Sequence, residues 1–407
     1  MNRRHFLACA GLGTLSAFSQ NSWLGVNATP NSNPRRLIVI FLRGAVDGLN
    51  VVIPYSDPNY YQYRPKIAIP KPGSPDGALD LDGRFGLHPA MAPVLPLWQQ
   101  GSLAFVHASG LTKDVRSHFD AQYYMETGVP GSSRRQDGWL NRLLVETNNK
   151  SPLQAISLSA NVPQILTGKM PVTSIGSTRQ ARNRQPIDRQ EVSTAFDQLY
   201  STSGTTLFRH YRAGWISRTR LLKDLETEMN MANNGAPLPT GFAAETRSLA
   251  RLMVKDDRIQ VAFLQLGGWD THINQGNSKG LLAKNLGELA QGLATLQQEL
   301  GDLYGQTQIV VMSEFGRTAR ENGNGGTDHG HGNAMWLLGG ATKGGKVYGQ
   351  WPGLAPEQLY QGRDLNVTTD FREPIAKILT NHLGLNTVST AKILPKFTSG
   401  INWSPIA

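Results

Sequence analysis

The run Leu37-Ile38-Val39-Ile40-Phe41-Leu42 decides the fold class, because an unbroken apolar run of this length is typical of a strand buried on both faces of a parallel sheet. A second run of the same kind is Ile259-Gln260-Val261-Ala262-Phe263-Leu264. Further strands are expected at 102–107, 308–312 and 334–338. Because these strands alternate with helical segments, we predict an α/β fold, a mostly parallel sheet with helices on both faces.

Leucine spacing gives the clearest helix. From Leu282 to Leu303 leucines recur at alternate spacings of four and three, and Gly305 ends the pattern. Glycines inside the stripe favour a helix packed on a sheet over a coiled coil. Other helices are predicted after Ser117 and over the following ranges: 91–100, 217–232, 242–254 and 370–383.

Composition favours one large folded domain. The chain has 407 residues, of which 39% are hydrophobic and 17% charged, so it can bury a sizeable core and is not expected to be disordered. We expect a single domain over 35–407, with a cap or insertion at 163–245 and a long surface loop at 57–90. Basic residues gather at the start of the proposed insertion: Lys169, Arg179, Arg182, Arg184 and Arg189.

The N-terminus resembles a targeting segment. Arg3-Arg4-His5-Phe6-Leu7 is a twin-arginine pattern, a weakly apolar run follows, and Val26-Asn27-Ala28 offers a small-residue cleavage site. The alternative is a chance arginine pair before a short helix. Because pattern, position and cleavage site agree, we predict that 1–28 is a signal peptide read by the twin-arginine export machinery. The mature protein would then be periplasmic or extracellular, and no later segment reads as a transmembrane span.

Cysteine content and charge narrow the chemistry. Cys9 is the one cysteine and lies in the predicted signal, so the mature chain would have no disulfide, cysteine nucleophile or thiolate ligand. The whole chain has a net charge of +10. Removal of the predicted signal peptide removes Arg3 and Arg4, so the mature protein would have a net charge of 10 − 2 = +8. This balance favours anionic partners such as a small-molecule or polymer ester. Nucleic acid is not expected, because the basic residues are scattered along an exported chain.

Candidate metal ligands follow the predicted strands. The first strand leads into Asp47, the second into Asp270 and His272, and a glycine-rich loop carries Thr327-Asp328-His329-Gly330-His331-Gly332. Because α/β proteins collect ligands at the carboxyl ends of parallel strands, these side chains are expected to meet at one edge of the sheet. Residues two apart in an extended segment also point the same way.

Carboxylate and imidazole ligands suit Zn²⁺, Mn²⁺ or Fe. Asp47, Asp270, His272, Asp328, His329 and His331 are more ligands than one structural ion needs, so a divalent metal is predicted, with two ions a plausible number, as in many phosphatases. The alternatives are ordinary turn roles. Asp47 precedes Gly48, and Asp270 with His272 could belong to a turn or cap a helix.

Two further segments are candidates for the site. Glu314 follows the predicted strand at 308–312 and is either a ligand, a partner of a ligand or a solvated acid. Ser117 and Asp120 have the spacing of a helix capping box, which makes an N-cap the simplest interpretation. The functional alternative makes Ser117 a nucleophile and His118 a ligand or an acid, beside a helix N-terminus that attracts phosphate.

Several segments together resemble the domain-of-unknown-function-1501 family. Besides the twin-arginine start they are Arg43-Gly44-Ala45-Val46-Asp47-Gly48-Leu49-Asn50, Arg116-Ser117-His118-Phe119-Asp120-Ala121-Gln122, Gly268-Trp269-Asp270-Thr271-His272, Ser313-Glu314-Phe315-Gly316-Arg317-Thr318 and Asp328-His329-Gly330. That family is similar in fold to the alkaline phosphatase and sulfatase superfamily. In that superfamily a first-strand Asp, an Asp/His pair, an Asp-His pair and a last His hold metal, which Asp47, Asp270 with His272, Asp328 with His329, and His331 match in order.

The resemblance implies an alkaline-phosphatase-like domain that acts as an exported metal-dependent hydrolase of phosphate or sulfate esters. Ser117 or a water molecule would attack, and Arg116 or Arg317 would steady the anion. This chain departs from the superfamily pattern, because no clear Ser or Thr nucleophile motif is present beyond Ser117. The alternatives are a non-catalytic exported binding protein that retains the fold and a cell-envelope assembly protein.

Overall fold

A nine-stranded sheet forms the centre of the domain, with strand order β11-β5-β10-β9-β1-β8-β6-β7 and β12 paired with β5. The computed structural model describes residues 34–132, 135–147, 154–159, 161–174 and 229–407. Its strands are β1 (Arg36–Leu42), β5 (Leu103–Gly110), β6 (Ala155–Ser157), β7 (Thr173–Ser174), β8 (Val261–Leu266), β9 (Thr307–Ser313), β10 (Asn333–Gly339), β11 (Lys346–Tyr348) and β12 (Thr369–Asp370).

The sheet is mostly parallel, as predicted. The first apolar run is the central strand β1, which pairs in parallel with β8 and with β9, so that Val39 lies between Phe263 and Val310. Among the described strands of this sheet only β10 runs the other way, antiparallel to both β9 and β5. The chain leaves β9 at Ser313 and enters β10 at Asn333, on the same edge of the sheet, so β10 must run back.

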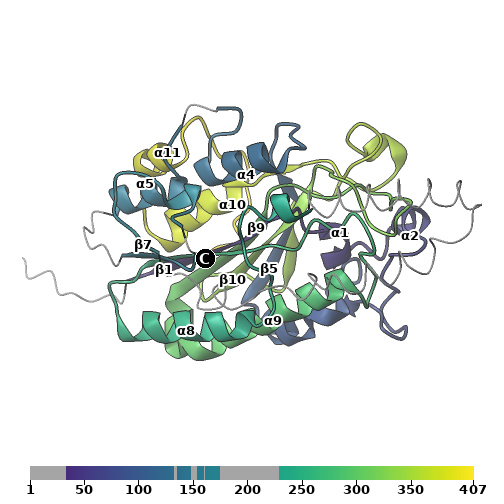
Figure 1. Cartoon of the computed structure of the whole chain (residues 1–407), viewed down its shortest axis with the longest axis horizontal. Helices are drawn as coiled ribbons and strands as arrows, with labels where there is room; N and C mark the ends of the chain where they lie inside the picture. Colours follow the sequence, from purple (N-terminus) through teal and green to yellow (C-terminus); the bar gives the residue numbers. More distant parts are fainter. Residues whose placement is uncertain (1–33, 133–134, 148–153, 160, 175–228) are drawn as a thin grey trace, which may run out of the picture. The chain divides into compact units, whose positions relative to one another are not determined.

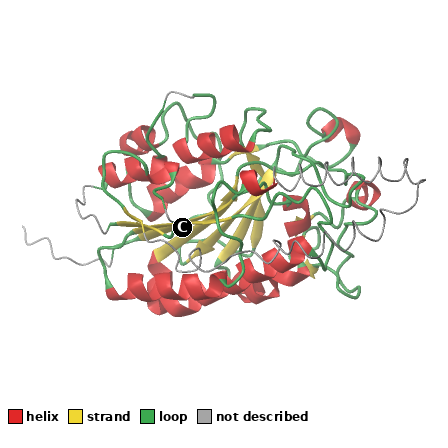
Figure 2. Cartoon of the chain, in the orientation of Figure 1, coloured by secondary structure: helices red, strands yellow, loops and turns green. Residues whose placement is uncertain are grey.

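Helices cover both faces of the sheet (Figures 1 and 2). On one face lie α8 (Phe242–Lys255) and α9 (Leu281–Leu300). On the other lie α4 (His118–Thr127), α5 (Trp139–Glu146), α10 (Arg372–Lys377) and α11 (Thr387–Ile393). The predicted α/β class with helices on both faces is therefore confirmed.

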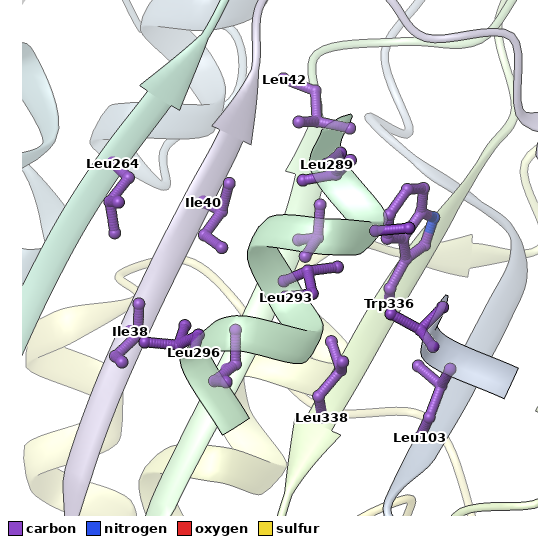
Figure 3. Close-up of a cluster of buried hydrophobic side chains, with 14 of the residues drawn as sticks. Ile38, Ile40, Leu42, Leu103, Leu264, Leu289, Leu293, Leu296, Trp336 and Leu338 are labelled. Atoms are coloured by element: carbon purple, nitrogen blue, oxygen red, sulfur yellow. The ribbon is translucent and has the colours of Figure 1, made fainter. Parts of the chain in front are cut away.

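The alternation of side chains along β1 explains the two layers. Ile38, Ile40 and Leu42 belong to the apolar core beneath α9, whereas Leu37, Val39 and Phe41 belong to the core on the opposite face. Figure 3 shows the first core, where leucines of α9 such as Leu289, Leu293 and Leu296 point at the sheet. The predicted leucine stripe is thus the buried face of α9 as far as Leu300, but the helix ends there and not at Gly305, and Leu303 lies in the 3₁₀ turn that follows.

Two helix predictions need correction. Residues 91–100 are a 3₁₀ turn, η1 (Pro89–Val94), followed by the short helix α3 (Leu95–Gln99), because Pro93 and Pro96 remove backbone donors that a continuous α-helix needs. Residues 370–383 begin at Arg372 as α10 and continue as the π-helical turn η5 (Ile378–His382). Of the helix expected at 217–232, residues 217–228 lie outside the described residues, and 229–232 are helical.

The prediction that residues 57–90 form a long surface loop was wrong. This segment contains α2 (Pro58–Tyr63) and the strands β3 (Leu79–Asp80) and β4 (Gly86–Leu87), which join β2 (Val52–Ile53) in a three-stranded sheet. Apolar side chains between the prolines and glycines build a small core of their own, which includes Tyr60 and Ile69. The helix α1 (Gly48–Val51) precedes β2.

The remaining described elements are short. They are η2 (Gln164–Leu166), η3 (Gly301–Gln306) and η4 (Pro356–Gln358). The structure groups Pro34–Ala407 as one compact unit. The predicted signal peptide and most of the predicted insertion, at 175–228, lie outside the described residues. No described helix is both long and apolar enough to cross a membrane.

Candidate metal centre

Three histidines surround one buried aspartate at the carboxyl edge of the sheet. The Asp270 Oδ1 atom lies 3.0 Å from Nε2 of His272, 3.5 Å from Nε2 of His329 and 3.6 Å from Nε2 of His118. The Nε2 atom of His329 is also 2.9 Å from that of His118 and 3.0 Å from that of His272. The ligand atoms of His118, Asp270 and His329 all lie within 4.8 Å of one another, so this group could hold a metal ion.

The sheet brings these residues together from three distant segments. His118 is the first residue of α4, which follows β5. Asp270 and His272 lie in the loop after β8, and His329 lies in the loop between β9 and β10. Since β5, β8 and β9 run in the same direction, their carboxyl ends reach the same edge, where α/β folds place ligands.

The second nitrogen of every ring is already bonded to an oxygen. His118 Nδ1 lies 2.7 Å from Glu314 Oε1, and His272 Nδ1 lies 3.2 Å from Asp328 Oδ1. His329 Nδ1 lies 2.9 Å from the backbone carbonyl oxygen of Arg116. A carbonyl oxygen accepts only, so the His329 ring carries its proton on Nδ1 and presents a lone pair at Nε2. The two carboxylates favour the same tautomer in the other rings, an arrangement typical of metal-ligating histidines.

The atoms of this group are suited to a cation. Lone pairs on Nε2 atoms as close as 2.9 Å repel each other unless a proton or a metal lies between them. The second carboxylate oxygen of Asp270 is buried and has no hydrogen-bond partner among the described residues, although buried polar atoms are normally paired. Three imidazoles and one carboxylate suit Zn²⁺, Mn²⁺ or Fe.

Charges around the centre keep the carboxylates ionised. Burial alone would raise the pKa of Asp270, but the Arg317 guanidinium and the neighbouring histidines hold that pKa well below its usual range. Burial opposes the ionisation of Glu314 too, yet the hydrogen bond to His118 lowers the pKa of Glu314 to about 2. The hydrogen bond to His272 lowers the pKa of Asp328 to about 2.

Protons occupy the centre when no metal does. Burial would lower the pKa of His118, but hydrogen bonds to Asp270 and Glu314 raise that pKa to about 9. For His329 the result is opposite, because burial and the nearby Arg317 charge lower its pKa. A metal ion would have to displace the proton of His118, so protons and metal compete for the same atoms.

Arg317 is a buried cation that contacts Asp270 of the centre. Its guanidinium is only 1% exposed, donates to the Asp270 carboxylate and also donates to the backbone carbonyl oxygens of Gly44, Ala45, Trp269 and Thr327. The sequence suggested a substrate-binding role for this arginine. In the structure the buried guanidinium pairs with Asp270 and helps to hold that carboxylate in place and ionised.

The structure does not bring Asp47 or His331 to the centre. Both oxygens of the fully buried Asp47 accept from Arg64, at 2.6 and 3.0 Å, and Oδ2 also accepts from Gln275 at 2.7 Å. His331 stacks on Tyr360 with ring centroids 4.4 Å apart, and burial lowers its pKa. Asp328, also expected as a ligand, instead holds the ring of His272.

Ser117 and Arg116 lie at the start of α4. Ser117 is the N-cap, with its exposed Oγ accepting from the backbone N–H of Asp120 at 3.4 Å, in agreement with the capping interpretation. The side chain of Arg116 is 36% exposed and donates to Asp364 at 3.2 Å and to Gln361 at 2.6 Å. Arg116 thus touches the centre through its carbonyl while its charge stays near solvent.

Sequence reasoning missed the residues that orient Glu314. Gln122 donates to Glu314 Oε1 at 2.9 Å, and Arg43 donates to Gln122 at 2.7 Å while pairing with Glu126 at 2.8 Å. The backbone N–H of Gly44 donates to the same Glu314 oxygen at 2.8 Å. The available signal was that Gln122 lies four residues after His118 and therefore on the same face of α4.

Residues 84–394 match the model of a family described as "Protein of unknown function (DUF1501)". The chain belongs to the DUF1501 family. The match includes His118, Asp270, His272 and His329, whereas Asp47 precedes it. No curated protein matches this DUF1501 chain.

Solved structures resemble the DUF1501 chain at low identity. The C-terminal periplasmic domain of EcEptC from Escherichia coli, solved in complex with Zn, has a TM-score of 0.42 and 10% identity, with 92% of this chain and 90% of that chain covered. The lipoteichoic acid synthase LtaP from Listeria monocytogenes has a TM-score of 0.40 and 10% identity, with 88% of this chain and 75% of that chain covered. A protein in the alkaline phosphatase superfamily from Vibrio parahaemolyticus has a TM-score of 0.38 and 13% identity, with 78% of this chain and 63% of that chain covered. At these identities and TM-scores the likeness carries no argument about the activity of this chain.

Proposed function

We propose that this DUF1501 protein is an exported, metal-dependent hydrolase of phosphate or sulfate esters. The observation that carries the proposal is the state of the three imidazoles. Each Nδ1 is bonded to an oxygen, while the Nε2 atoms of His118, His272 and His329 surround one oxygen of the buried Asp270. A structural packing role would not need three rings whose Nε2 atoms converge on one buried carboxylate oxygen.

His118, Asp270, His272 and His329 would hold the ion. A divalent Zn, Mn or Fe ion bound there would supply Lewis acidity toward an ester oxygen and lower the pKa of a bound water. The number of acidic and histidine residues made two ions a plausible number in the sequence analysis. Among the described residues, however, the structure forms one group of three or more ligand side chains within mutual reach.

The attack requires an oxygen nucleophile beside His118. Ser117 offers its exposed hydroxyl one residue before that ligand, and a water molecule is the other candidate. The nucleophile would bond to phosphorus or sulfur as the bond to the alcohol oxygen breaks, and the proton lost by the attacking hydroxyl or water would pass to the leaving alcohol. If Ser117 is the nucleophile, a water molecule would then hydrolyse the seryl ester and restore the hydroxyl. Arg116 and the free N–H groups at the start of the ten-residue helix α4 would stabilise the anionic oxygens.

Charge and the N-terminus support the choice of substrate and compartment. The positive net charge of the whole chain favours an anionic small-molecule or polymer ester. The twin-arginine pattern at Arg3-Arg4 supports export to the periplasm or beyond, by machinery that carries folded proteins with their cofactor in place.

The test uses the exported protein, purified from its native compartment without chelators. We expect bound Zn, Mn or Fe by elemental analysis, and turnover in a panel of aryl phosphate and sulfate esters that a chelator abolishes. His329→Ala should lose both the metal and the turnover. His382→Ala is the matched control, because His382 is also buried but bonds to the carbonyl of Arg36, at the opposite end of β1.

Metal without turnover would contradict the hydrolase proposal. If the metal-loaded protein cleaves no ester and instead co-purifies with another exported protein, the binding or assembly alternatives would replace it. A folded protein that arrives without metal would remove the basis of the proposal altogether.

A further inference from the structure

Asp47 was expected to ligate a metal, yet it is fully buried in a different set of contacts. We propose that the centre holds a single ion and that Asp47 acts through Gln275 to position the two loops that carry Asp270, His272 and His329. This inference rests on the metal-binding part of the proposed function and does not depend on the hydrolysis.

Gln275 joins the two ligand loops. Its Oε1 accepts from the hydroxyl of Thr271 at 2.7 Å and from the hydroxyl of Thr327 at 3.1 Å. Thr271 lies between the ligands Asp270 and His272, and Thr327 lies two residues before His329. The backbones of the loops also meet there, since the N–H of Thr327 donates to the carbonyl of Thr271 at 3.1 Å. All three bonding side chains are fully buried.

Asp47 decides which way the Gln275 amide faces. A carboxylate only accepts, so the amide nitrogen must face Asp47, to which it donates at 2.7 Å. The amide oxygen is then directed at the two threonine hydroxyls. With Asp47 absent, the amide could rotate and present a donor to the same hydroxyls, which would loosen the contact between the loops.

Arg64 keeps Asp47 in this role. It pairs with both carboxylate oxygens in a fully buried salt bridge and also donates to the carbonyl oxygens of Thr318 and Ala319, each at 2.9 Å. Both are in the segment that follows Arg317 and leads to His329. The guanidinium thus supplies the positive charge that a buried carboxylate needs, and Asp47 has no need of a metal ion.

A second ligand set is not available from the other candidates. Both Glu314 oxygens are engaged, Oε1 by His118, Gln122 and the Gly44 N–H, and Oε2 by the Ser313 hydroxyl. His331 is stacked on Tyr360 and is not a member of the ligand group formed by His118, Asp270 and His329. The described part of the chain therefore offers ligands for one ion.

The experiment measures Zn²⁺ stoichiometry and affinity on the full-length protein, by elemental analysis and by competition with a chromophoric chelator. We expect one equivalent of Zn²⁺ in wild type and in Asp47→Asn. Gln275→Leu and Asp47→Asn should each weaken Zn²⁺ binding roughly ten- to hundredfold, as loss of a supporting contact does at other metal sites. The double variant should be no weaker than Gln275→Leu alone, because both changes break one relay.

Two control variants show the result of losing a ligand and the result of an unrelated buried substitution. Asp270→Asn, which removes a ligand, should lose the ion. Gln308→Leu should bind Zn²⁺ as wild type does, although Gln308 is an equally buried glutamine that also bonds a threonine hydroxyl, that of Thr342 at 3.1 Å near the other end of β9. The visible spectrum of Co²⁺-loaded protein should shift in Gln275→Leu and not in Gln308→Leu, which separates positioning from a general loss of stability.

Several outcomes would overturn the inference. They are two Zn²⁺ per wild-type chain with one lost in Asp47→Asn, wild-type affinity in Gln275→Leu, additive losses in the double variant, or no Zn²⁺ in wild type. If Asp47→Asn does not fold, Gln275→Leu decides alone. If Zn²⁺ binding changes in the variants as expected but no ester is turned over, the hydrolase proposal is rejected and this inference stands. If esters are turned over but Gln275→Leu binds Zn²⁺ with wild-type affinity, this inference is rejected and the hydrolase proposal stands.

Discussion

His118 and His329 face each other with their Nε2 atoms 2.9 Å apart, while the Nδ1 atoms are bonded to Glu314 and to the carbonyl of Arg116. The two rings are 211 residues apart in the sequence and make an edge-to-face contact with centroids 4.3 Å apart. Neither ring could be rotated without breaking its Nδ1 bond. The oxygens behind the rings therefore determine how well the lone pairs in front can bind metal.

Glu314→Gln tests this dependence. The substitution keeps the size of the side chain but removes the charge that fixes the His118 proton on Nδ1, so Zn²⁺ affinity should fall roughly ten- to hundredfold. Chelator competition measures the change. Glu373→Gln is the control, because Glu373 is also buried and accepts from Ser399 and the Gly400 N–H, in α10. Equal affinity in wild type and Glu314→Gln would refute the dependence.

Ser117→Ala should separate the capping role from chemistry. Loss of the N-cap should lower the free energy of unfolding by about 1 kcal/mol, and Ser117→Asn should restore it, because asparagine caps equally well. Urea unfolding measures both variants. If Ser117 is the nucleophile, neither variant should turn over an ester. If both retain wild-type turnover, a water molecule is the attacking group. Unchanged stability in Ser117→Ala would contradict the cap.

His107 should make the protein sensitive to mild acid. Burial lowers the pKa of His107 to about 4, and the neutral ring both donates to the Val52 carbonyl at 2.9 Å and accepts from the Ala108 N–H at 3.0 Å. An unfolded histidine takes up its proton near pH 6.5. The folded state is therefore favoured above pH 6.5, and about 3 kcal/mol of that stability is lost as the pH falls from 6.5 to 4.

Urea midpoints at pH 7.5, 6 and 5 would check this acid dependence. Burial lowers the pKa of His88 to about 4 as well, so His107→Gln should reduce the pH dependence without removing it. A midpoint that does not change over this range would show that neither ring is held neutral.

The core beneath α9 gives a stability prediction. Leu293 is 1% exposed and points at the sheet, so Leu293→Ala should cost about 2–5 kcal/mol through lost burial and the cavity left behind. Leu281 begins the same helix and is 38% exposed, so Leu281→Ala should change stability by less than about 0.5 kcal/mol. Thermal unfolding measures both, and equal effects would contradict the assigned buried face.

The sequence predicted the fold well where one rule acts alone. The apolar run of β1 and the leucine stripe of α9 are buried along their whole length. Burial alone therefore determined their residue types, and the patterns were easy to recognise. The segment at 57–90 failed because isolated tyrosines and isoleucines between prolines carry no periodic signal, although Tyr60 and Ile69 are buried. The reversal of β10 could not be seen either, since a strand's direction depends on where the chain re-enters the sheet.

The site was predicted in part. Asp270, His272 and His329 meet as expected at the carboxyl edge, and His118 joins them as a ligand candidate. His329 and His331 do not share a direction, because the rule for residues two apart requires regular strand backbone, and His329 makes only an isolated bridge with Arg317. Nothing in the sequence around Asp47 revealed its distant partner Arg64.

The separation of the ligands along the chain has a mechanical consequence. From His118 to Asp270 is 270 − 118 = 152 residues, and from Asp270 to His329 is 329 − 270 = 59 residues. An ion held by all three would link these loops in the folded state, and it would stabilise that state because the unfolded chain does not form the site. Since Cys9 is the one cysteine, the described domain cannot contain a disulfide, and the ion would be the link between these distant segments.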